Sequence, residues 1–201
     1  MKPFTILLAT SNQGKLREIR ELFTARAVCS PHDLGVFADA PETGETFAEN
    51  AMQKARFYRD AAARVSTTPF LVIADDSGIA VAALGGFPGI HSKRWAGDHV
   101  TDAERCELLL EKMAGISDRR AEFVCAAAAI LPDGQEIAVT GTLEGELLRA
   151  LQGENGFGYD PIFFVPELGK TCAELTREEK NAVSHRGKAM RALRESILAN
   201  G

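Results

Sequence analysis

The sequence predicts an α/β protein built on a mixed β-sheet with flanking helices, on two observations. Strand-like and helical segments alternate: an apolar strand at 4–10 precedes a helix, and a second strand at 71–74 follows one. Two later strand-like segments, 120–131 and 135–148, are joined by Pro-Asp-Gly at 132–134, which is typical of a hairpin. Strands separated by helices, combined with a hairpin, indicate a sheet of mixed direction.

The composition indicates a globular protein with no nucleic-acid or membrane partner. The 201 residues, 45% hydrophobic and 25% charged, suffice for one large domain or two lobes. A net charge of −5 argues against a broad nucleic-acid surface, and no apolar run approaches the length of a membrane span. The opening segment becomes polar too soon for a signal peptide, and the four cysteines lie far apart with no CxxC pair. We therefore expect a cytoplasmic protein with reduced thiols.

The first predicted strand, Phe4–Thr10, leads directly into a polar turn and a helix that starts near Leu16. This arrangement binds phosphate well, because free backbone N–H groups and the helix dipole both point at the anion. Lys15 lies in the first helical turn, where the dipole disfavours a cation unless an anion is bound beside it. The simpler interpretation is that a threonine, serine or asparagine of the turn only caps the helix.

A loop at residues 31–45 precedes a helix predicted from Phe47 to about Arg64. A capping box of the T-x-x-E type opens this helix and gives Glu49 a structural task. Glu42 lies in the loop and has no such task. It is therefore the better candidate for a carboxylate that binds a metal.

The segment LVIADDSG, residues 71–78, is the centre of the prediction. Its apolar half, Leu71–Ala74, is typical of a buried strand, which we expect to end at two adjacent aspartates. Because neighbouring side chains of an extended chain point to opposite faces, only one of Asp75 and Asp76 is expected to face a site. A carboxylate at the carboxyl end of an interior strand suits Mg²⁺ and, through it, phosphate. The alternative is an ordinary Asp-Ser-Gly turn.

The rest of the chain supplies two helices and one more polar loop. A second capping box opens a helix at 101–113. After the hairpin, the polar segment 151–158 leads through Tyr-Asp-Pro into a short strand at 162–165. A third capping box opens a closing helix, which is predicted to run from Thr176 to about Asn200.

Four polar clusters lie in or next to the irregular segments: 10–15, 75–77, 157–160 and 180–186. If they converge, they offer a phosphate-binding turn, metal-binding carboxylates, an aromatic face and a Lys-His-Arg set, which together would bind a nucleoside polyphosphate. Each cluster alone has an ordinary explanation, such as a helix cap, a turn or a solvated helix surface. No serine, cysteine or histidine has the partners of a covalent nucleophile, so we expect direct attack by water.

The sequence resembles the inosine triphosphatase family, which includes the bacterial dITP/XTP pyrophosphatases. The likeness runs in order from about Ile6 to Leu193 and covers nearly the whole chain. The segments that carry it are TSNQGK, ETGETFAENAMQKAR, ADDSG, LGGFPGIHSKRWAG, GFGYDPIFF and ELTREEKNAVSHR. FGYDP and KNAVSHR are the specific pieces, whereas TSNQGK alone would be weak.

The resemblance implies Mg²⁺-dependent hydrolysis of ITP, dITP or XTP to the monophosphate and pyrophosphate. It also implies a homodimer, and an elongated mixed sheet in a single two-lobed domain, residues 1–201, with the nucleotide in a central cleft between the lobes. By position, Asp76 is the proton acceptor and a metal ligand, and Glu42 is the second metal ligand. The positions implied to bind the substrate are Thr10, Ser11, Asn12, Gln13, Gly14, Lys15, Ser77, Phe157, Gly158, Tyr159, Asp160, Lys180, His185 and Arg186.

The chemistry of the purine gives a reason for selectivity. Hypoxanthine and xanthine carry an acceptor oxygen at C6, where adenine carries a donor amine. Donors such as Lys180 and Arg186 would therefore disfavour adenine by about 1–3 kcal/mol for each mispaired buried group. Two alternatives stay open: a pyrophosphatase for other modified nucleotides, and a nucleotide-binding module that does not hydrolyse. The intact Asp76 and Glu42 argue against the module, because triphosphate binding alone does not need them.

Overall fold

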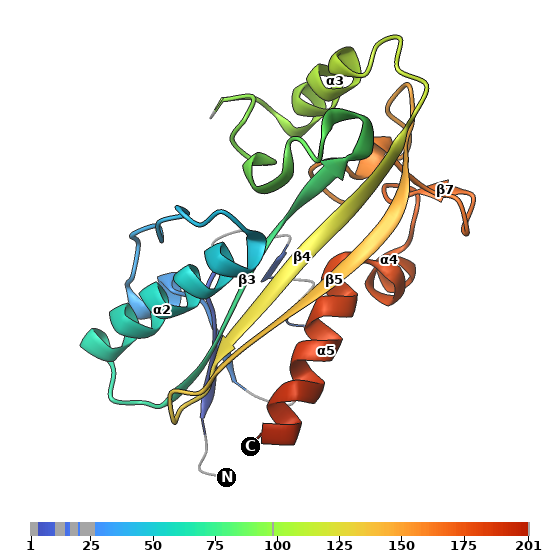
Figure 1. Cartoon of the computed structure of the whole chain (residues 1–201). Coiled ribbons are helices and arrows are strands. Elements are labelled where there is room, and N and C mark those ends of the chain that lie inside the picture. Colours follow the sequence, from blue (N-terminus) through green and yellow to red (C-terminus); the bar gives the residue numbers. More distant parts are fainter. Residues whose placement is uncertain (1–3, 11–14, 17–19, 21–26, 98, 201) are drawn as a thin grey trace. The chain divides into compact units, whose positions relative to one another are not determined.

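The computed structural model describes residues 4–10, 15–16, 20, 27–97 and 99–200. Within these residues, one sheet of seven strands has the order β2-β1-β3-β4-β5-β6-β7, of which Figure 1 labels β3, β4, β5 and β7. β1 pairs in parallel with β2 and β3, whereas β6 pairs antiparallel with β5 and β7, so the predicted α/β class with a mixed sheet is confirmed. The strands are β1 (Thr5–Leu8), β2 (Val28–Cys29), β3 (Phe70–Val81), β4 (Arg120–Ile130), β5 (Glu136–Leu147), β6 (Phe163–Val165) and β7 (Lys170–Thr171).

Three of the described helices begin where the capping boxes predicted them to begin. At Thr46, Thr101 and Thr176 the threonine side chain accepts the N–H of a glutamate three residues later, and the glutamate side chain bonds back. The described α-helices include none with the length and apolar character that crossing a membrane requires. They include α2 (Phe47–Val65), α3 (Asp102–Lys112), α4 (Arg177–Val183) and α5 (His185–Asn200).

β3 continues past the point where the sequence predicted its end. The strand runs through both aspartates to Val81, so the expected stop and the alternative of a turn were both wrong. The second half of the strand is held by tertiary contacts: the Ile79 N–H donates to Ser92 Oγ at 2.9 Å. A Cβ on Gly78 would lie 2.3 Å from the same oxygen, so the glycine permits a close approach instead of forming a turn.

The closing helix is two helices, which corrects the prediction of one. Ser184 has φ −63° and ψ 152°, an extended conformation that ends α4, and its N–H donates to the Lys180 carbonyl at 2.8 Å. α5 begins at the next residue. The break therefore falls inside the KNAVSHR segment and divides its polar residues between two helices.

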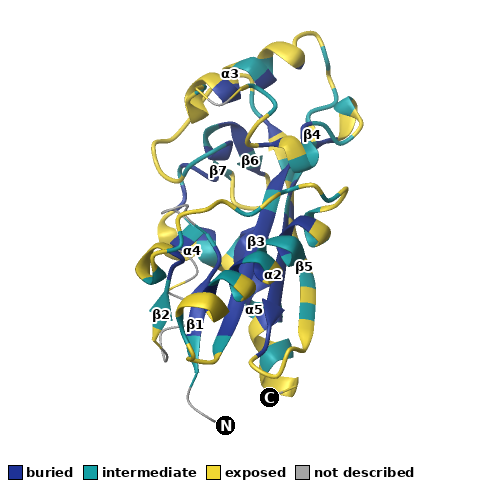
Figure 2. Ribbon diagram, turned by 90° about the vertical axis from the view of Figure 1, so that its left-hand side faces the viewer, coloured by how far each residue is buried: buried dark blue, intermediate teal, exposed yellow. Residues whose placement is uncertain are grey.

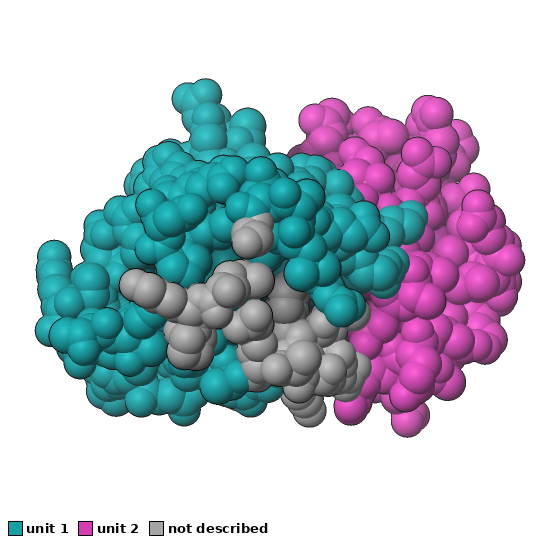
Figure 3. All heavy atoms as spheres, turned by 90° about the horizontal axis from the view of Figure 1, so that it is seen from below, with its two compact units in different colours: residues 1–76, 125–141, 186–201 teal, residues 77–124, 142–185 magenta. Residues whose placement is uncertain are grey.

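The chain divides into two compact units, which Figure 3 shows in different colours. Unit 1 contains residues 1–76, 125–141 and 186–201, and unit 2 contains residues 77–124 and 142–185. β3, β4 and β5 each contribute residues to both units. The single two-lobed domain and its central cleft stay predictions.

The core of unit 1 has two layers, one on each side of the sheet. Ala126 and Ala128 of β4 pack in one cluster with α2, whereas Cys125 and Ala127 pack in another with α5. This alternation follows from the period of two in a strand, which turns successive side chains to opposite faces. Figure 2 shows β3 and β4 as mostly buried.

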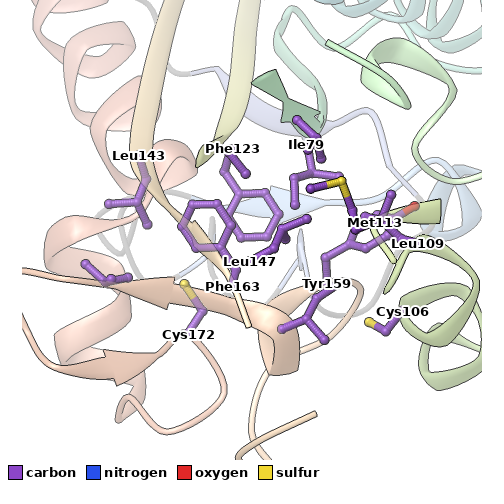
Figure 4. Packing of buried hydrophobic residues seen from close by; sticks show 14 residues of the cluster. Ile79, Cys106, Leu109, Met113, Phe123, Leu143, Leu147, Tyr159, Phe163 and Cys172 are labelled. Carbon is purple, nitrogen blue, oxygen red and sulfur yellow. The ribbon is translucent and has the colours of Figure 1, made fainter. Parts of the chain in front are cut away.

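The core of unit 2 joins α3 to the strands. Leu109 of α3 belongs to the same buried cluster as Ile79 of β3, Phe123 of β4 and Phe163 of β6 (Figure 4). The rings of Phe123 and Phe163 stack with their centroids 4.2 Å apart. This packing fixes α3 within unit 2.

Candidate active site

The two adjacent carboxylates of β3 lie in unit 1 and have different partners. Asp75 is fully buried and forms ion pairs with Lys15 Nζ at 2.8 Å and with Arg186 Nε at 3.3 Å. Burial alone would raise the pKa of Asp75, but Lys15 and Arg186 hold it well below its usual range. Asp75 is therefore an anion that anchors two of the cations predicted to bind substrate.

The surroundings of Asp76 shift its pKa in the opposite direction from that of Asp75. Its Oδ2 accepts a hydrogen bond from Asn50 Nδ2 at 3.2 Å, and its Oδ1 accepts one from Lys54 Nζ at 3.1 Å. Burial raises the pKa of Asp76 by more than Lys54 and Lys15 lower it. Neighbouring carboxyl groups whose pKa values are pushed apart can divide their roles, one as a structural anion and the other as a proton acceptor.

Lys54 of α2 joins Asp76 to Glu42. Its Nζ lies 2.5 Å from Glu42 Oε1 and 3.1 Å from Asp76 Oδ1, and it also donates to the Asp75 carbonyl at 3.3 Å. Burial alone would lower the pKa of Lys54, but the two carboxylates raise it, so the ammonium keeps its charge. Glu42 and Asp76, the two predicted metal ligands, thus contact the same ammonium group.

Asn50 and Lys54 are contacts of Asp76 that the sequence reasoning missed. Both lie on α2, four residues apart, and therefore on the same face of the helix. The available signal was their spacing, because polar side chains four residues apart share one face of the predicted helix. Asn50 is fully buried, and besides contacting Asp76 it accepts the Gly44 N–H at 2.8 Å.

Glu42 and Asp76 supply ligands of the kind that Mg²⁺ prefers. Magnesium is commonly held by one or two carboxylates, with waters and substrate phosphates as its other ligands. The described residues contain no group of three or more histidines, cysteines or carboxylates that could hold a metal by themselves. The contact of both carboxylates with one ammonium shows that this position favours a cation. The donor set therefore fits a magnesium–phosphate complex.

In unit 2 the predicted aromatic loop forms a compact ion-paired group. Asp160 is buried, and its Oδ2 accepts the Phe157 N–H at 2.8 Å and Lys180 Nζ at 2.6 Å. The same ammonium lies 4.6 Å from the centroid of the Phe157 ring. A Cβ on Gly156 would lie 2.0 Å from Asp160 Oδ2, so only glycine allows this approach. The loop, the ring and the lysine are held as one group.

The side chain of Tyr159 supports this loop. Its hydroxyl donates to the Ser92 carbonyl at 2.6 Å and accepts a hydrogen bond from Trp95 Nε1 at 2.6 Å. Burial raises the pKa of Tyr159 above its usual value, so the hydroxyl keeps the proton that it donates. Trp95 is the only tryptophan of the chain, which makes its fluorescence a specific probe of this contact.

The basic residues of the KNAVSHR segment are not solvated helix residues. Lys180, His185 and Arg186 are all buried. The His185 ring stacks on Phe123 in unit 2, with centroids 4.7 Å apart and an angle of 20° between the planes. Burial of three basic side chains requires anionic or aromatic partners, and the contacts above supply them.

The structure brings the predicted site residues into two groups, each within its own unit. Lys15, Glu42, Asp75, Asp76 and Arg186 form the group in unit 1. The group in unit 2 contains Phe157, Gly158, Tyr159, Asp160, Lys180 and His185. Thr10 and Ser77 are half-buried, and Ser11, Asn12, Gln13 and Gly14 lie outside the described residues. The binding of one substrate by both groups stays a prediction.

Comparisons with known proteins match nearly the whole length of the chain. A sequence model of the Ham1 family matches residues 6–196. The chain is 50% identical to the dITP/XTP pyrophosphatase of Streptomyces coelicolor in an alignment 197 residues long that covers 94% of each protein. It is 42% identical to the dITP/XTP pyrophosphatase of Clostridium perfringens in an alignment 201 residues long that covers 98% of each protein. The solved structure of the Staphylococcus aureus Ham1 protein matches with a TM-score of 0.85 at 42% identity, covering 98% of this chain and all of that one.

Proposed function

The chain belongs to the Ham1 family, and on that premise we propose that it hydrolyses ITP, dITP and XTP to the monophosphate and pyrophosphate. Its relatives in Streptomyces coelicolor and Clostridium perfringens carry the name dITP/XTP pyrophosphatase. The geometric observation that supports the proposal most is the pair of carboxylates, Glu42 and Asp76, at the Lys54 ammonium. A module that only bound nucleotide would not need this pair beside a phosphate.

In the proposed hydrolysis, a water molecule attacks the α-phosphorus and pyrophosphate leaves. Asp76 accepts a proton from this water. Asn50 and Lys54 each hold one oxygen of this carboxylate, which fixes its orientation. The attack is direct, without a covalent enzyme intermediate.

The polyphosphate is assigned to residues of unit 1. Thr10 to Lys15 would supply backbone N–H groups and one ammonium at a helix N-terminus. Asp75 holds Lys15 in place through the 2.8 Å ion pair. Glu42 and Asp76 would hold Mg²⁺, which when bound would neutralise phosphate charge and polarise a phosphoryl oxygen. Ser77, the next residue after Asp76, is assigned to the substrate as well.

The nucleoside is assigned to Phe157 to Asp160, Lys180, His185 and Arg186. The half-buried Phe157 ring would stack on the base. The lysine and arginine are donors and would pair with the 6-oxo group of hypoxanthine or xanthine, whereas the 6-amino group of adenine would meet donors. A buried mispaired group of this kind costs about 1–3 kcal/mol.

The proposal also covers assembly and location. We propose that residues 1–201 act as a single two-lobed domain, that the chain works as a homodimer, and that it works in the cytoplasm. The last point is supported by the thiols: all four cysteines are described and none is in a disulfide.

The experiment that tests the reaction is hydrolysis of ITP in ¹⁸O-labelled water with Mg²⁺. Attack at the α-phosphorus places the label in inosine monophosphate and leaves the pyrophosphate unlabelled. Label in the pyrophosphate would refute the proposed site of attack. The rates of hydrolysis of ITP, XTP, dUTP and ATP, compared with one another, test the alternative that the chain is a pyrophosphatase for other modified nucleotides. Tight binding of ITP without any product would favour the non-hydrolysing module.

A further inference from the structure

Gly158, in the middle of the aromatic loop, is bound on both of its backbone polar groups by α3. Its N–H donates to Asp102 Oδ2 at 2.7 Å, and its carbonyl accepts the Cys106 thiol at a sulfur–oxygen distance of 3.3 Å. Asp102 and Cys106 are four residues apart and so lie on one face of the helix. All of these residues belong to unit 2.

The Asp102 carboxylate is itself held in place. Arg105 Nη1 donates to Asp102 Oδ1 at 2.5 Å, and Arg105 Nη2 donates to the Val100 carbonyl at 2.9 Å. The Arg105 side chain is 9% exposed, whereas the Asp102 side chain is 51% exposed. One oxygen of Asp102 is thus fixed by a buried guanidinium, and the other is left to bind the loop.

Cys106 anchors the same face of α3 in the core. It is fully buried, in one cluster with Leu109 and Tyr159. Burial raises the pKa of the Cys106 thiol to about 12, and nearby Asp102 adds to the effect. The thiol therefore keeps its proton at neutral pH and can donate it to the Gly158 carbonyl.

These contacts leave the loop little freedom at three successive residues. The Phe157 N–H is bound by Asp160, Gly158 by α3, and the Tyr159 hydroxyl by Ser92 and Trp95. Gly158 has φ +64°, a conformation that other residues rarely adopt. The α3 contacts hold this residue directly beside the one that carries the predicted stacking ring.

We propose that α3 positions the purine-binding loop, and that Asp102 is the positioning residue that sets the affinity for the base through the Gly158 amide. The inference rests on the proposed function, because it assigns the loop to the nucleobase. Asp102 is not a catalytic residue in this account. Its loss should weaken binding of the base and leave the rate of the bound complex largely unchanged.

The test compares three variants by calorimetry with inosine monophosphate and by ITP kinetics. Asp102→Ala should raise Kd for inosine monophosphate and KM for ITP about tenfold, with kcat within about threefold, because one charge-assisted hydrogen bond is lost. Asp102→Asn has one acceptor oxygen for two donors, Arg105 Nη1 and the Gly158 N–H, so it should raise Kd by about threefold, less than Asp102→Ala does. Asp118→Ala, the matched control, removes an exposed carboxylate of unit 2 that pairs with Arg120 and should change nothing.

Three outcomes would overturn the inference. These are an unchanged Kd in Asp102→Ala, a larger rise in Kd in Asp102→Asn than in Asp102→Ala, and a fall in kcat without a change in KM. The Trp95 fluorescence and the melting temperature show whether the alanine variant is folded. If it is not, Asp102→Asn and Cys106→Ala decide the question. Cys106→Ala should raise Kd about two- to threefold, because the Gly158 carbonyl loses a weak donor. If the wild type binds inosine monophosphate but releases no pyrophosphate from ITP, the proposed function fails and the comparison of Kd values still stands. If the wild type binds no inosine monophosphate, both fail.

Discussion

Replacing Lys54 with methionine should destabilise the protein because two carboxylates lose their shared cation. Lys54 Nζ contacts Glu42 Oε1 at 2.5 Å and Asp76 Oδ1 at 3.1 Å. Methionine keeps much of the length of the side chain, so the change removes mainly the charge and its hydrogen bonds. Asp76 would then be a buried carboxylate with Asn50 as its remaining described side-chain donor.

The magnitude follows from the contact with Asp76. Unit charges 3.1 Å apart at an effective dielectric constant of about 20 attract each other by roughly 5 kcal/mol. About half of this is offset, since the variant no longer has to desolvate the ammonium. The Glu42 side chain is 31% exposed, so water screens its part and it adds little. We expect the free energy of unfolding to fall by about 2–3 kcal/mol at pH 7.

The loss should depend on pH with a definite sign. The folded-state pKa of Asp76 is already raised, and losing Lys54 raises it further. The folded state then binds a proton more tightly than the unfolded state, so stability falls as pH rises and returns in part as pH falls from 7 towards 5.

Urea denaturation of the variant and the wild type at pH 7 and pH 5 measures both effects. The control is Lys170→Met, which breaks an ion pair of 3.2 Å with Glu179 between side chains 45% and 43% exposed. The control should lose at most about 1 kcal/mol at either pH. A loss in Lys54→Met no larger than that of the control, or an equal loss at both pH values, would refute the reasoning.

Asp76→Asn should lower kcat by at least about 10²-fold while Kd for ITP stays within about threefold, because the proton acceptor is lost and the shape is kept. Loss of ITP binding together with residual turnover would contradict the role of Asp76 as the proton acceptor. Arg186→Ala should narrow the ITP-over-ATP ratio of kcat/KM by about tenfold, since one donor to the 6-oxo group is removed. The ratio is the right measure because Arg186 also pairs with buried Asp75, and an unchanged ratio would place selectivity elsewhere. Ellman's reagent on the native protein should titrate Cys29 first, because it is half-buried and Cys106, Cys125 and Cys172 are buried. Rapid reaction of all four cysteines would mean that the reagent reaches the three that the structure shows as buried.

Local interactions were predictable from the sequence because both partners lie within a few residues of each other. The capping box at Thr46 and Glu49 is the clearest case: Glu49 Oε2 accepts the Thr46 N–H at 3.1 Å and the Glu45 N–H at 2.7 Å. Glu49 therefore serves the helix N-terminus, whereas Glu42 contacts Lys54. The starts of α2, α3 and α4 and the two hairpin strands were predictable for the same reason.

Features set by tertiary contacts were not predictable. The path of β3 through its aspartates depends on Ser92, thirteen residues away along the chain from Ile79. The different environments of Asp75 and Asp76 depend on which of Lys15 and Lys54 each one meets, and the sequence alone ranks neither pairing. Strands of two residues, such as β2 and β7, are too short for a periodic signal.

Release of pyrophosphate from ITP and from ATP, side by side and with and without Mg²⁺, tests the central claim most directly. We expect that release of pyrophosphate from ITP requires Mg²⁺. Release from ATP should be slower by at least about tenfold, which is the discrimination expected from one mispaired buried group. Equal rates for the two nucleotides, or the same rate from ITP after removal of the metal, would contradict it.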